Sequence, residues 1–134
     1  MTTLFFQDSL TLDALTAGAD YLGEIDAADV IGADLGGHIC AARAADYNYQ
    51  ARSLTYELER RPYLFNARDK QRKRADALRW SVLHAIYHQA AQIHQGYGTE
   101  ATACRELNER LKLLYDYNQA CAIQETAELL RERN

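Results

Sequence analysis

His84 and His88 are the residues of this sequence whose spacing is most suggestive of chemistry. Histidines four positions apart lie on one face of a helix, where two imidazoles can bind a single metal ion. A third ligand would have to come from elsewhere, and no H-E-x-x-H pattern places a carboxylate between them. The alternative is a polar helix face that meets solvent or a neighbouring helix. We therefore expect no cofactor and keep this pair as the candidate metal site.

Arg79 precedes His84 with four residues between them, in the order R-W-S-V-L-H. This stretch resembles the R-x4-6-H motif of the HEPN ribonuclease families, which are compact four-helix bundles that often dimerise. The resemblance implies that His84 would act as the acid or base and Arg79 would contact the phosphate during RNA cleavage by the ribose 2′-hydroxyl. It covers six residues, and Trp80 stands where the family commonly has a polar residue.

A second feature is the basic segment, residues 60–79, which combines cations with aromatic side chains. Proteins that bind single-stranded nucleic acids use both types, because cations neutralise phosphates and aromatic rings stack on bases. The alternative is that Tyr63, Leu64 and Phe65 plug one end of a helical bundle while the arginines face water. The candidate binding residues of this segment are Arg60, Arg61, Arg68, Lys70, Arg72, Lys73, Arg74 and Arg79.

The net charge of −4 conceals three unequal blocks. Residues 1–40 carry seven acidic residues and no basic one, residues 41–80 carry ten basic and five acidic residues, and residues 81–134 carry five basic and seven acidic residues. Such asymmetry is typical of a surface that binds phosphates or an acidic partner. It is also compatible with an acidic N-terminal segment that folds back onto the basic one, in the same subunit or in a second one.

Composition decides which elements must position these residues. Alanine occurs 22 times and leucine 17 times, whereas valine occurs twice and proline once. This excludes sandwiches, barrels and doubly wound α/β folds, which need many β-branched residues. Three stretches without Gly or Pro follow residue 37, at 38–61, 63–95 and 99–134. We predict one all-α domain over residues 1–134: an acidic, Gly-punctuated helical segment at 1–37, then three long helices at 38–134 in a bundle or helical hairpin.

Hydrophobic spacing supports these helices. In the first long stretch, small and apolar residues recur every three or four positions at Cys40, Ala44, Tyr47, Ala51, Leu54 and Leu58. The second carries two adjoining apolar faces, one through Leu78, Val82, Ile86 and Ile93, the other through Trp80, Leu83, Tyr87 and Ala90. The third begins with Leu107, Leu111, Leu114 and Cys121 and drifts toward Ile123, Ala127 and Leu130.

Polar residues at the expected boundaries predict helix caps. Asn66 would cap the second long helix, Pro62 would end the first at about Arg61, and Thr99 or Thr102 would cap the third. Gly96 and Gly98 suit the C-terminal end of the second long helix. Before residue 37, Ser9 would cap a helix from Leu10 to Leu22, and Asp26 a short one through Leu35. Residues 2–6 are either a short strand or an apolar anchor.

The cysteine pattern and the lengths of the apolar runs bear on the cellular location of the protein. The three cysteines, Cys40, Cys104 and Cys121, are odd in number and widely spaced, with no C-x-x-C pair. They predict reduced, small core residues in the cytoplasm. No segment approaches a membrane span, and the first basic residue is Arg43, so neither a membrane protein nor an exported one is expected.

We expect a small non-enzymatic binding protein, an adaptor or inhibitor that docks on a larger macromolecule, such as one that handles nucleic acid. No glycine-rich phosphate loop or Ser/His/Asp set points to an enzyme. The alternatives are direct nucleic-acid binding through residues 60–79 and a HEPN-like ribonuclease that uses Arg79 and His84. Because such long helices in a small chain bury their apolar faces best against another copy, we also expect a homo-oligomer.

Overall fold

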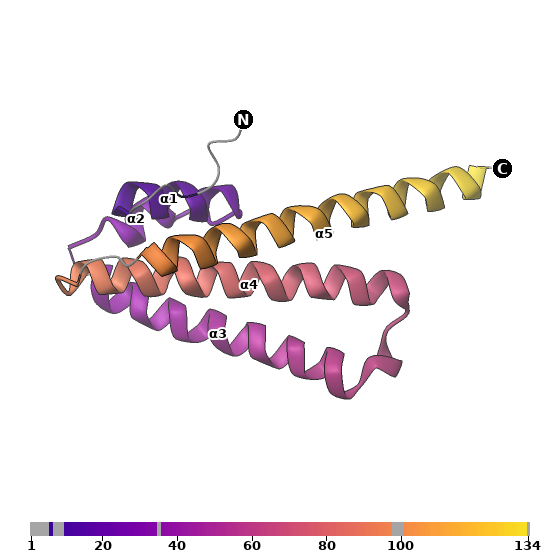
Figure 1. Cartoon of the computed structure of the whole chain (residues 1–134), viewed down its shortest axis with the longest axis horizontal. Helices are drawn as coiled ribbons and strands as arrows, with labels where there is room; N and C mark the ends of the chain where they lie inside the picture. The colour runs from indigo at the N-terminus through magenta and orange to yellow at the C-terminus, as the bar shows by residue number, and fades with distance from the viewer. Residues whose placement is uncertain (1–5, 7–9, 35, 98–100, 134) are drawn as a thin grey trace.

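The computed structural model describes residues 6, 10–34, 36–97 and 101–133. All regular secondary structure in these residues is helical: α1 (Leu12–Tyr21), α2 (Ala27–Ile31), α3 (Gly36–Arg60), the short 3-10 helix η1 (Pro62–Leu64), α4 (Ala67–His94) and α5 (Ala101–Arg133). The predicted all-α architecture, with three long helices after a short helical segment, is confirmed (Figure 1). No helix in the described residues combines the length and apolar character that crossing a bilayer requires.

Capping explains the boundaries of the long helices. The Asn66 side chain accepts a hydrogen bond from the backbone N–H of Asp69 at 2.8 Å, so Asn66 caps α4 as predicted. Helix α3 ends at Arg60, two residues before Pro62. Gly96, which follows α4, has a φ of 89°, a conformation that glycine adopts without strain. Thr102 lies inside α5 and is not its N-cap, and Thr99 lies outside the described residues.

The caps of the short helices were predicted less well. Thr11 caps α1, because its hydroxyl accepts from the backbone N–H of Ala14 at 3.1 Å; Ser9 lies outside the described residues. Asp26 does precede α2, but its side chain makes no capping hydrogen bond and turns to Arg43 instead. Helix α2 ends at Ile31, earlier than predicted. A strong cation within reach thus outcompetes the backbone amides for the Asp26 carboxylate.

Helix α4 is the central element of the bundle. It packs most extensively against α3, with which it forms an antiparallel hairpin, and next against α5. Helix α1 packs on α4 and α2 on α3 (Figure 1). The three long helices lie close together where α1 and α2 cover them, which we call the closed end. They diverge toward η1 and the C-terminus, which we call the open end (Figure 1).

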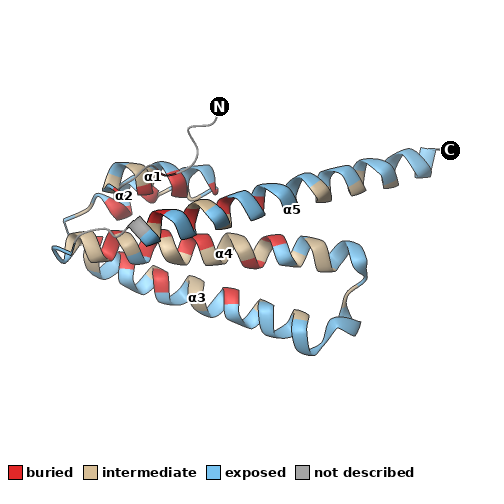
Figure 2. Cartoon of the chain, viewed as in Figure 1, coloured by how far each residue is buried: buried red, intermediate tan, exposed pale blue. Residues whose placement is uncertain are grey.

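The core lies at the closed end. Its largest fully buried side chains include Leu15, Ile31, Leu83, Tyr87 and Leu107. Both predicted apolar faces of α4 contribute side chains to this core, and so does the predicted row of small and apolar residues on α3. Burial then falls toward the open end, where most residues are exposed (Figure 2). The seam of α5 is buried through Leu114 but is not covered over its last turns.

Two glycines allow the short helices to approach the long ones. A Cβ atom on Gly18 of α1 would lie 2.9 Å from the Phe6 ring. A Cβ atom on Gly36, where α3 begins, would lie 2.8 Å from the carbonyl oxygen of Val30 and 2.7 Å from Nε2 of His94. Phe6 is itself held by Asn108, which exchanges two hydrogen bonds with its backbone, at 2.6 and 2.8 Å. Helix α1 is therefore packed tightly against Phe6 and α4, and Phe6 is fixed to α5.

Candidate docking surface

The turn between α3 and α4 presents aromatic and apolar side chains to solvent. Tyr63 is 78% exposed and Leu64 is 54% exposed, while Phe65 is half-buried. The idea that all three plug the end of the bundle is therefore wrong for Tyr63 and Leu64. The reason is that α3 and α4 have already diverged at this point, so there is no core for the two side chains to enter (Figure 1).

Two arginines precede these side chains in the sequence. Arg60 and Arg61 are both exposed at the end of α3, and the guanidinium of Arg60 lies 5.9 Å from the centre of the Tyr56 ring. Tyr56 is itself 58% exposed. We call this group of five residues the tip cluster: Tyr56, Arg60, Arg61, Tyr63 and Leu64. It combines cationic groups with aromatic and apolar surface, the composition that is enriched at protein–protein interfaces.

The basic segment continues along α4, where α5 neutralises part of it. Arg68 forms an ion pair with Glu128 at 2.8 Å, and Arg72 forms one with Glu125. Lys70, Lys73 and Arg74 have no carboxylate partner among the described residues. The basic charge that remains available therefore lies on the tip cluster and on these three side chains.

In the described residues, the N-terminal helices do not cover residues 60–74 of the basic segment. Helices α1 and α2 lie at the closed end, whereas residues 60–74 lie at the open end (Figure 1). Among the described residues, the ion pair that joins the acidic block to the basic block is the one between Asp26 and Arg43. Of the basic segment, Arg79 reaches the end of α1, donating to the carbonyl oxygen of Leu22 at 2.9 Å. Most of the compensation comes instead from the C-terminal turns of α5.

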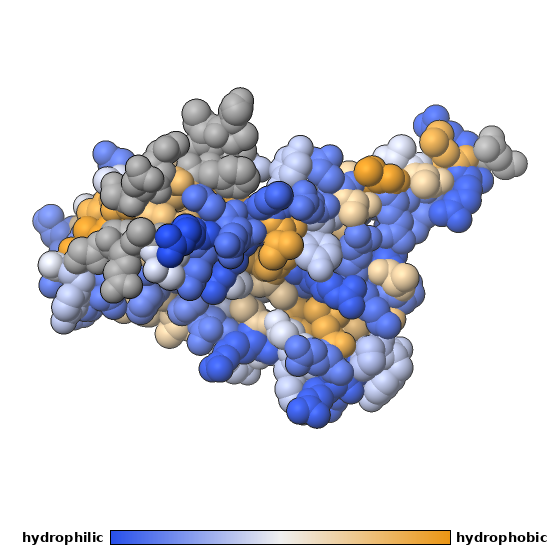
Figure 3. All heavy atoms as spheres, viewed as in Figure 1, coloured by the Kyte–Doolittle hydropathy of each residue, from blue (hydrophilic) through white to orange (hydrophobic). Residues whose placement is uncertain are grey.

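A groove opens between α3, α4 and α5 beside the tip cluster, with a volume of about 670 Å³. Leu78 of α4 and Leu113 and Tyr117 of α5 are among its apolar lining residues. Arg52 and Arg74 are among the charged residues that border it. Figure 3 shows apolar surface within the hollow of the open end. The groove exists because the bundle has three helices here and no fourth element fills the space.

Arg79 and His84 are turned toward different elements. Arg79 donates to Leu22 at the end of α1 and lies 5.1 Å from the centre of the Trp80 ring. Nδ1 of His84 lies 2.8 Å from the carbonyl oxygen of Ala44 on α3, the geometry of an N–H donating to that carbonyl. Both side chains therefore bridge helices. The structure does not bring them together on one surface where a phosphate could contact both.

His84 and His88 do share one helix face, as predicted. Their rings stack with centroids 5.9 Å apart, and His88 is exposed. In the described part of the chain, no group of three or more His, Cys, Asp or Glu residues could hold a metal ion. The pair thus gains no third protein ligand from the elements that surround it.

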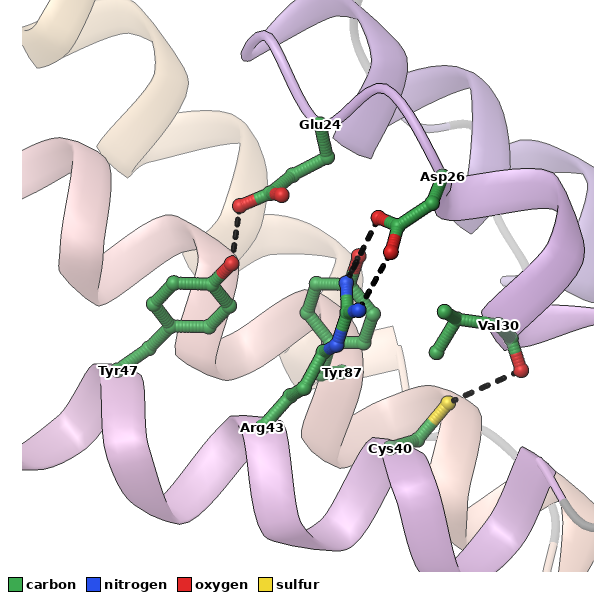
Figure 4. A network of polar contacts seen from close by, with 7 residues as sticks. All are labelled: Glu24, Asp26, Val30, Cys40, Arg43, Tyr47 and Tyr87. Carbon is green, nitrogen blue, oxygen red and sulfur yellow. Dashed lines mark hydrogen bonds and ion pairs between the residues drawn. The ribbon is translucent and has the colours of Figure 1, made fainter.

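The most connected polar cluster lies at the closed end, between the α1–α2 turn, α3 and α4 (Figure 4). The guanidinium of Arg43 donates to both oxygens of Asp26, at 2.9 and 2.6 Å, and to the hydroxyl of Tyr87 at 3.4 Å. The Tyr47 hydroxyl donates to the Glu24 carboxylate. Tyr47 also stacks on Trp80 at 5.5 Å. These contacts tie the turn after α1 to both long helices of the hairpin.

Burial and pairing shift the pKa values within this cluster. The hydrogen bond from Arg43 lowers the pKa of Asp26, and the same bond raises the pKa of Arg43. Burial, followed by the bond to Glu24, raises the pKa of Tyr47. Burial also raises the pKa of Tyr87, against the opposing effect of Arg43. Tyr87 is fully buried and its polar partner belongs to the protein, so the cluster is structural.

Sequence reasoning missed this cluster. Asp26 was expected to cap α2, and Arg43 was counted only as part of the basic block. The available signal was a cation on the same helix face as Tyr47, one turn earlier, in a segment otherwise rich in alanine. That signal identifies a cation near the helix interface but not the carboxylate that pairs with it.

No family model, curated protein or solved structure matches this chain.

Proposed function

We propose that this protein is a non-enzymatic binding protein, an adaptor or inhibitor, that docks on a larger macromolecule through the tip cluster. The observation that carries the proposal is the exposure of Tyr63 and Leu64 shortly after the exposed Arg60 and Arg61. Tyrosine and arginine supply much of the binding energy at protein interfaces, because both bury large areas and keep a polar group for hydrogen bonding. The helical hairpin of α3 and α4 presents them at its exposed end, where a partner can reach them.

The test is a capture experiment with the full chain and two matched variants. Tyr63→Ala combined with Leu64→Ser removes the apolar part of the tip cluster. Ile25→Ser alters a side chain that is 100% exposed in the α1–α2 turn, at the closed end. We expect one stoichiometric partner that the wild type and Ile25→Ser retain and that the tip variant loses. Absence of any stoichiometric partner, or equal retention by all three proteins, would contradict the proposal.

The second candidate is direct binding of nucleic acid by the basic segment. It is supported by Lys70, Lys73 and Arg74, which have no carboxylate partner among the described residues. Affinity for a fluorescent single-stranded RNA should then fall steeply with salt, because each phosphate contact releases a counterion. Reversing the three charges to glutamate should abolish binding, while Lys112→Glu on α5 should leave it unchanged. Salt-independent binding, or no binding at low salt, would rule this candidate out.

The ribonuclease hypothesis has a direct test of its own. If Arg79 and His84 were catalytic, purified protein would cleave RNA, and Arg79→Ala and His84→Ala would each remove the activity. Intact RNA after incubation with the wild type would eliminate this hypothesis.

The odd number of cysteines, with no C-x-x-C pair, supports a cytoplasmic location for any of these functions.

A further inference from the structure

We propose that two copies of this chain associate through an antiparallel contact between their α5 helices, centred on Ala120. The contact uses what we call the α5 strip: Leu113, Tyr117, Ala120, Ile123, Ala127 and Leu130. The proposal concerns self-association, which the length of the helices favours, and it does not depend on the tip cluster or its partner.

Four residues of the α5 strip are exposed in the described part of the chain, whereas Ala120 is partly buried and Tyr117 is partly buried against the core. Leu113 is 51% exposed, Ile123 is 69% exposed and Leu130 is 57% exposed. The strip lies on a different face of α5 from Leu107, Leu111 and Leu114, which are buried in the core. The last turns of α5 also extend beyond the end of α4 (Figure 1). A helix that protrudes with a continuous apolar stripe is stable in water when the stripe packs against another helix.

Apart from Leu130, whose counterpart ten positions before Ala120 is Arg110, the spacing of the strip is that of a self-complementary surface. Leu113 and Ala127 each lie seven positions from Ala120, and Tyr117 and Ile123 each lie three positions from it. In a two-fold antiparallel pair centred on Ala120, Leu113 of one copy therefore meets Ala127 of the other, and Tyr117 meets Ile123. The pair of Leu113 and Ala127 sets a large side chain opposite a small one, which lets the helices interdigitate, and Tyr117 and Ile123 form a larger apolar pair. Ala120 packs against its own counterpart, where a small residue allows the helices to cross closely.

Two charged residues of α5 are also placed symmetrically about Ala120. Glu109 and Arg131 lie eleven positions on either side of Ala120, and both side chains are exposed. Two-fold pairing places Glu109 of one copy beside Arg131 of the other, and symmetry repeats the pair at the opposite end of the contact. A parallel pair would instead set each residue beside an identical charge. The charges therefore select the antiparallel direction.

The open-end groove extends the contact beyond α5. Leu113 and Tyr117 belong both to the strip and to the groove lining. In the antiparallel pair, the last turns of one α5 lie beside these two residues of the second copy, at the entrance of its groove. The second copy thus occupies part of the space that a fourth helix would fill, and each copy does the same for the other.

The first test measures the mass of the full-length protein in solution by sedimentation equilibrium. We expect a dimer for the wild type and a loss of dimer affinity on the order of 30-fold or more for Ile123→Asp. Leu129→Asp is the matched control, because Leu129 is 61% exposed on α5 but lies off the strip. Its dimer should persist. A wild-type monomer at every concentration, or equal effects of the two variants, would overturn the proposal.

The second test locates the two-fold axis. In a Cys121→Ser background, Ala120→Cys should form an intermolecular disulfide on mild oxidation, because the two copies of residue 120 meet. Ala127→Cys in the same background should not, since antiparallel pairing separates its two copies by about 21 Å along the helices. Cross-linking of Ala127→Cys, as a parallel pair would give, or no cross-linking of either variant, contradicts the proposed arrangement.

The third test exchanges the charges. Glu109→Arg and Arg131→Glu should each weaken the dimer, because each creates two like-charge pairs. The double variant should recover wild-type affinity, since it restores both opposite-charge pairs with their signs reversed. Both residues are exposed, so the fold tolerates the changes, which circular dichroism verifies. A double variant that stays as weak as the singles shows that the two residues do not meet and would overturn the proposal.

Discussion

Arg43 joins three segments of the chain through one guanidinium. It pairs with Asp26 before α2, it reaches the hydroxyl of Tyr87 on α4, and it is itself on α3. His84 and Arg79 act in a similar way, each donating to a carbonyl oxygen of another helix. The side chains that look most reactive in the sequence are thus used to connect helices. At this scale the sequence identifies candidate polar residues but not their partners.

Asp26→Asn tests the main ion pair. Because Arg43 lowers the pKa of Asp26 in the folded state, the unfolded chain binds a proton more readily than the folded one. The stabilisation is present above the ordinary aspartate pKa and is lost as the pH falls through the lowered value. We expect Asp26→Asn to reduce the free energy of unfolding by about 1 kcal/mol at pH 7, a modest loss because the pair is partly exposed.

Urea unfolding of wild type and variant at pH 7, 5 and 3 measures this effect. The difference between them should persist from pH 7 to pH 5 and shrink by pH 3. Asp46→Asn is the control, because Asp46 is an exposed carboxylate of α3 with no ion pair among the described residues. A difference that is independent of pH, or equal for the two variants, would show that the ion pair does not stabilise the fold.

At the scale of elements, local sequence signals decide where the long helices begin and end. The scarcity of Gly and Pro after residue 37 predicts α3, α4 and α5, and Asn66 and Pro62 predict the boundary between the first two. These predictions hold because capping and proline geometry depend on a few neighbouring residues. Residues 10–35 were predicted less well, since helices of five to ten residues form only when tertiary contacts stabilise them.

Asn66→Ala tests the cap of α4. It removes the hydrogen bond to the Asp69 amide, so the free energy of unfolding should fall by about 1 kcal/mol in urea denaturation. Thr102→Ala serves as the comparison, because Thr102 is exposed inside α5 and should change stability by no more than a few tenths of a kcal/mol. A larger loss for Thr102→Ala than for Asn66→Ala would mean that the caps are wrongly assigned.

The whole molecule is a bundle with one closed and one open end. The closed end holds the core, covered by α1 and α2, whereas at the open end three helices diverge and leave apolar side chains exposed. The tip cluster, the groove and the α5 strip all lie at the open end. The buried core that stabilises the fold and the exposed candidate interaction surfaces thus lie at opposite ends of the bundle.

Hydrogen exchange followed by mass spectrometry measures this separation. Amides of residues 82–91, whose side chains are largely buried, should exchange only through global unfolding. Amides of residues 54–60, at the exposed end of α3, should exchange by local opening and therefore at least tenfold faster. Equal protection of the two segments would mean that the open end is as stable as the core.

The sequence by itself determined the helical class, the three long helices, the inward faces of α3 and α4 and the uneven charge. Each of these depends on residue type and on spacing within a few turns. Only the tertiary structure decided that Asp26 meets Arg43, that α5 neutralises Arg68 and Arg72, and that the N-terminal helices cover the end opposite the basic segment. These facts depend on how helices pack across long sequence separations. No local pattern encodes the divergence of the helices at the open end, and this divergence leaves Tyr63 and Leu64 exposed.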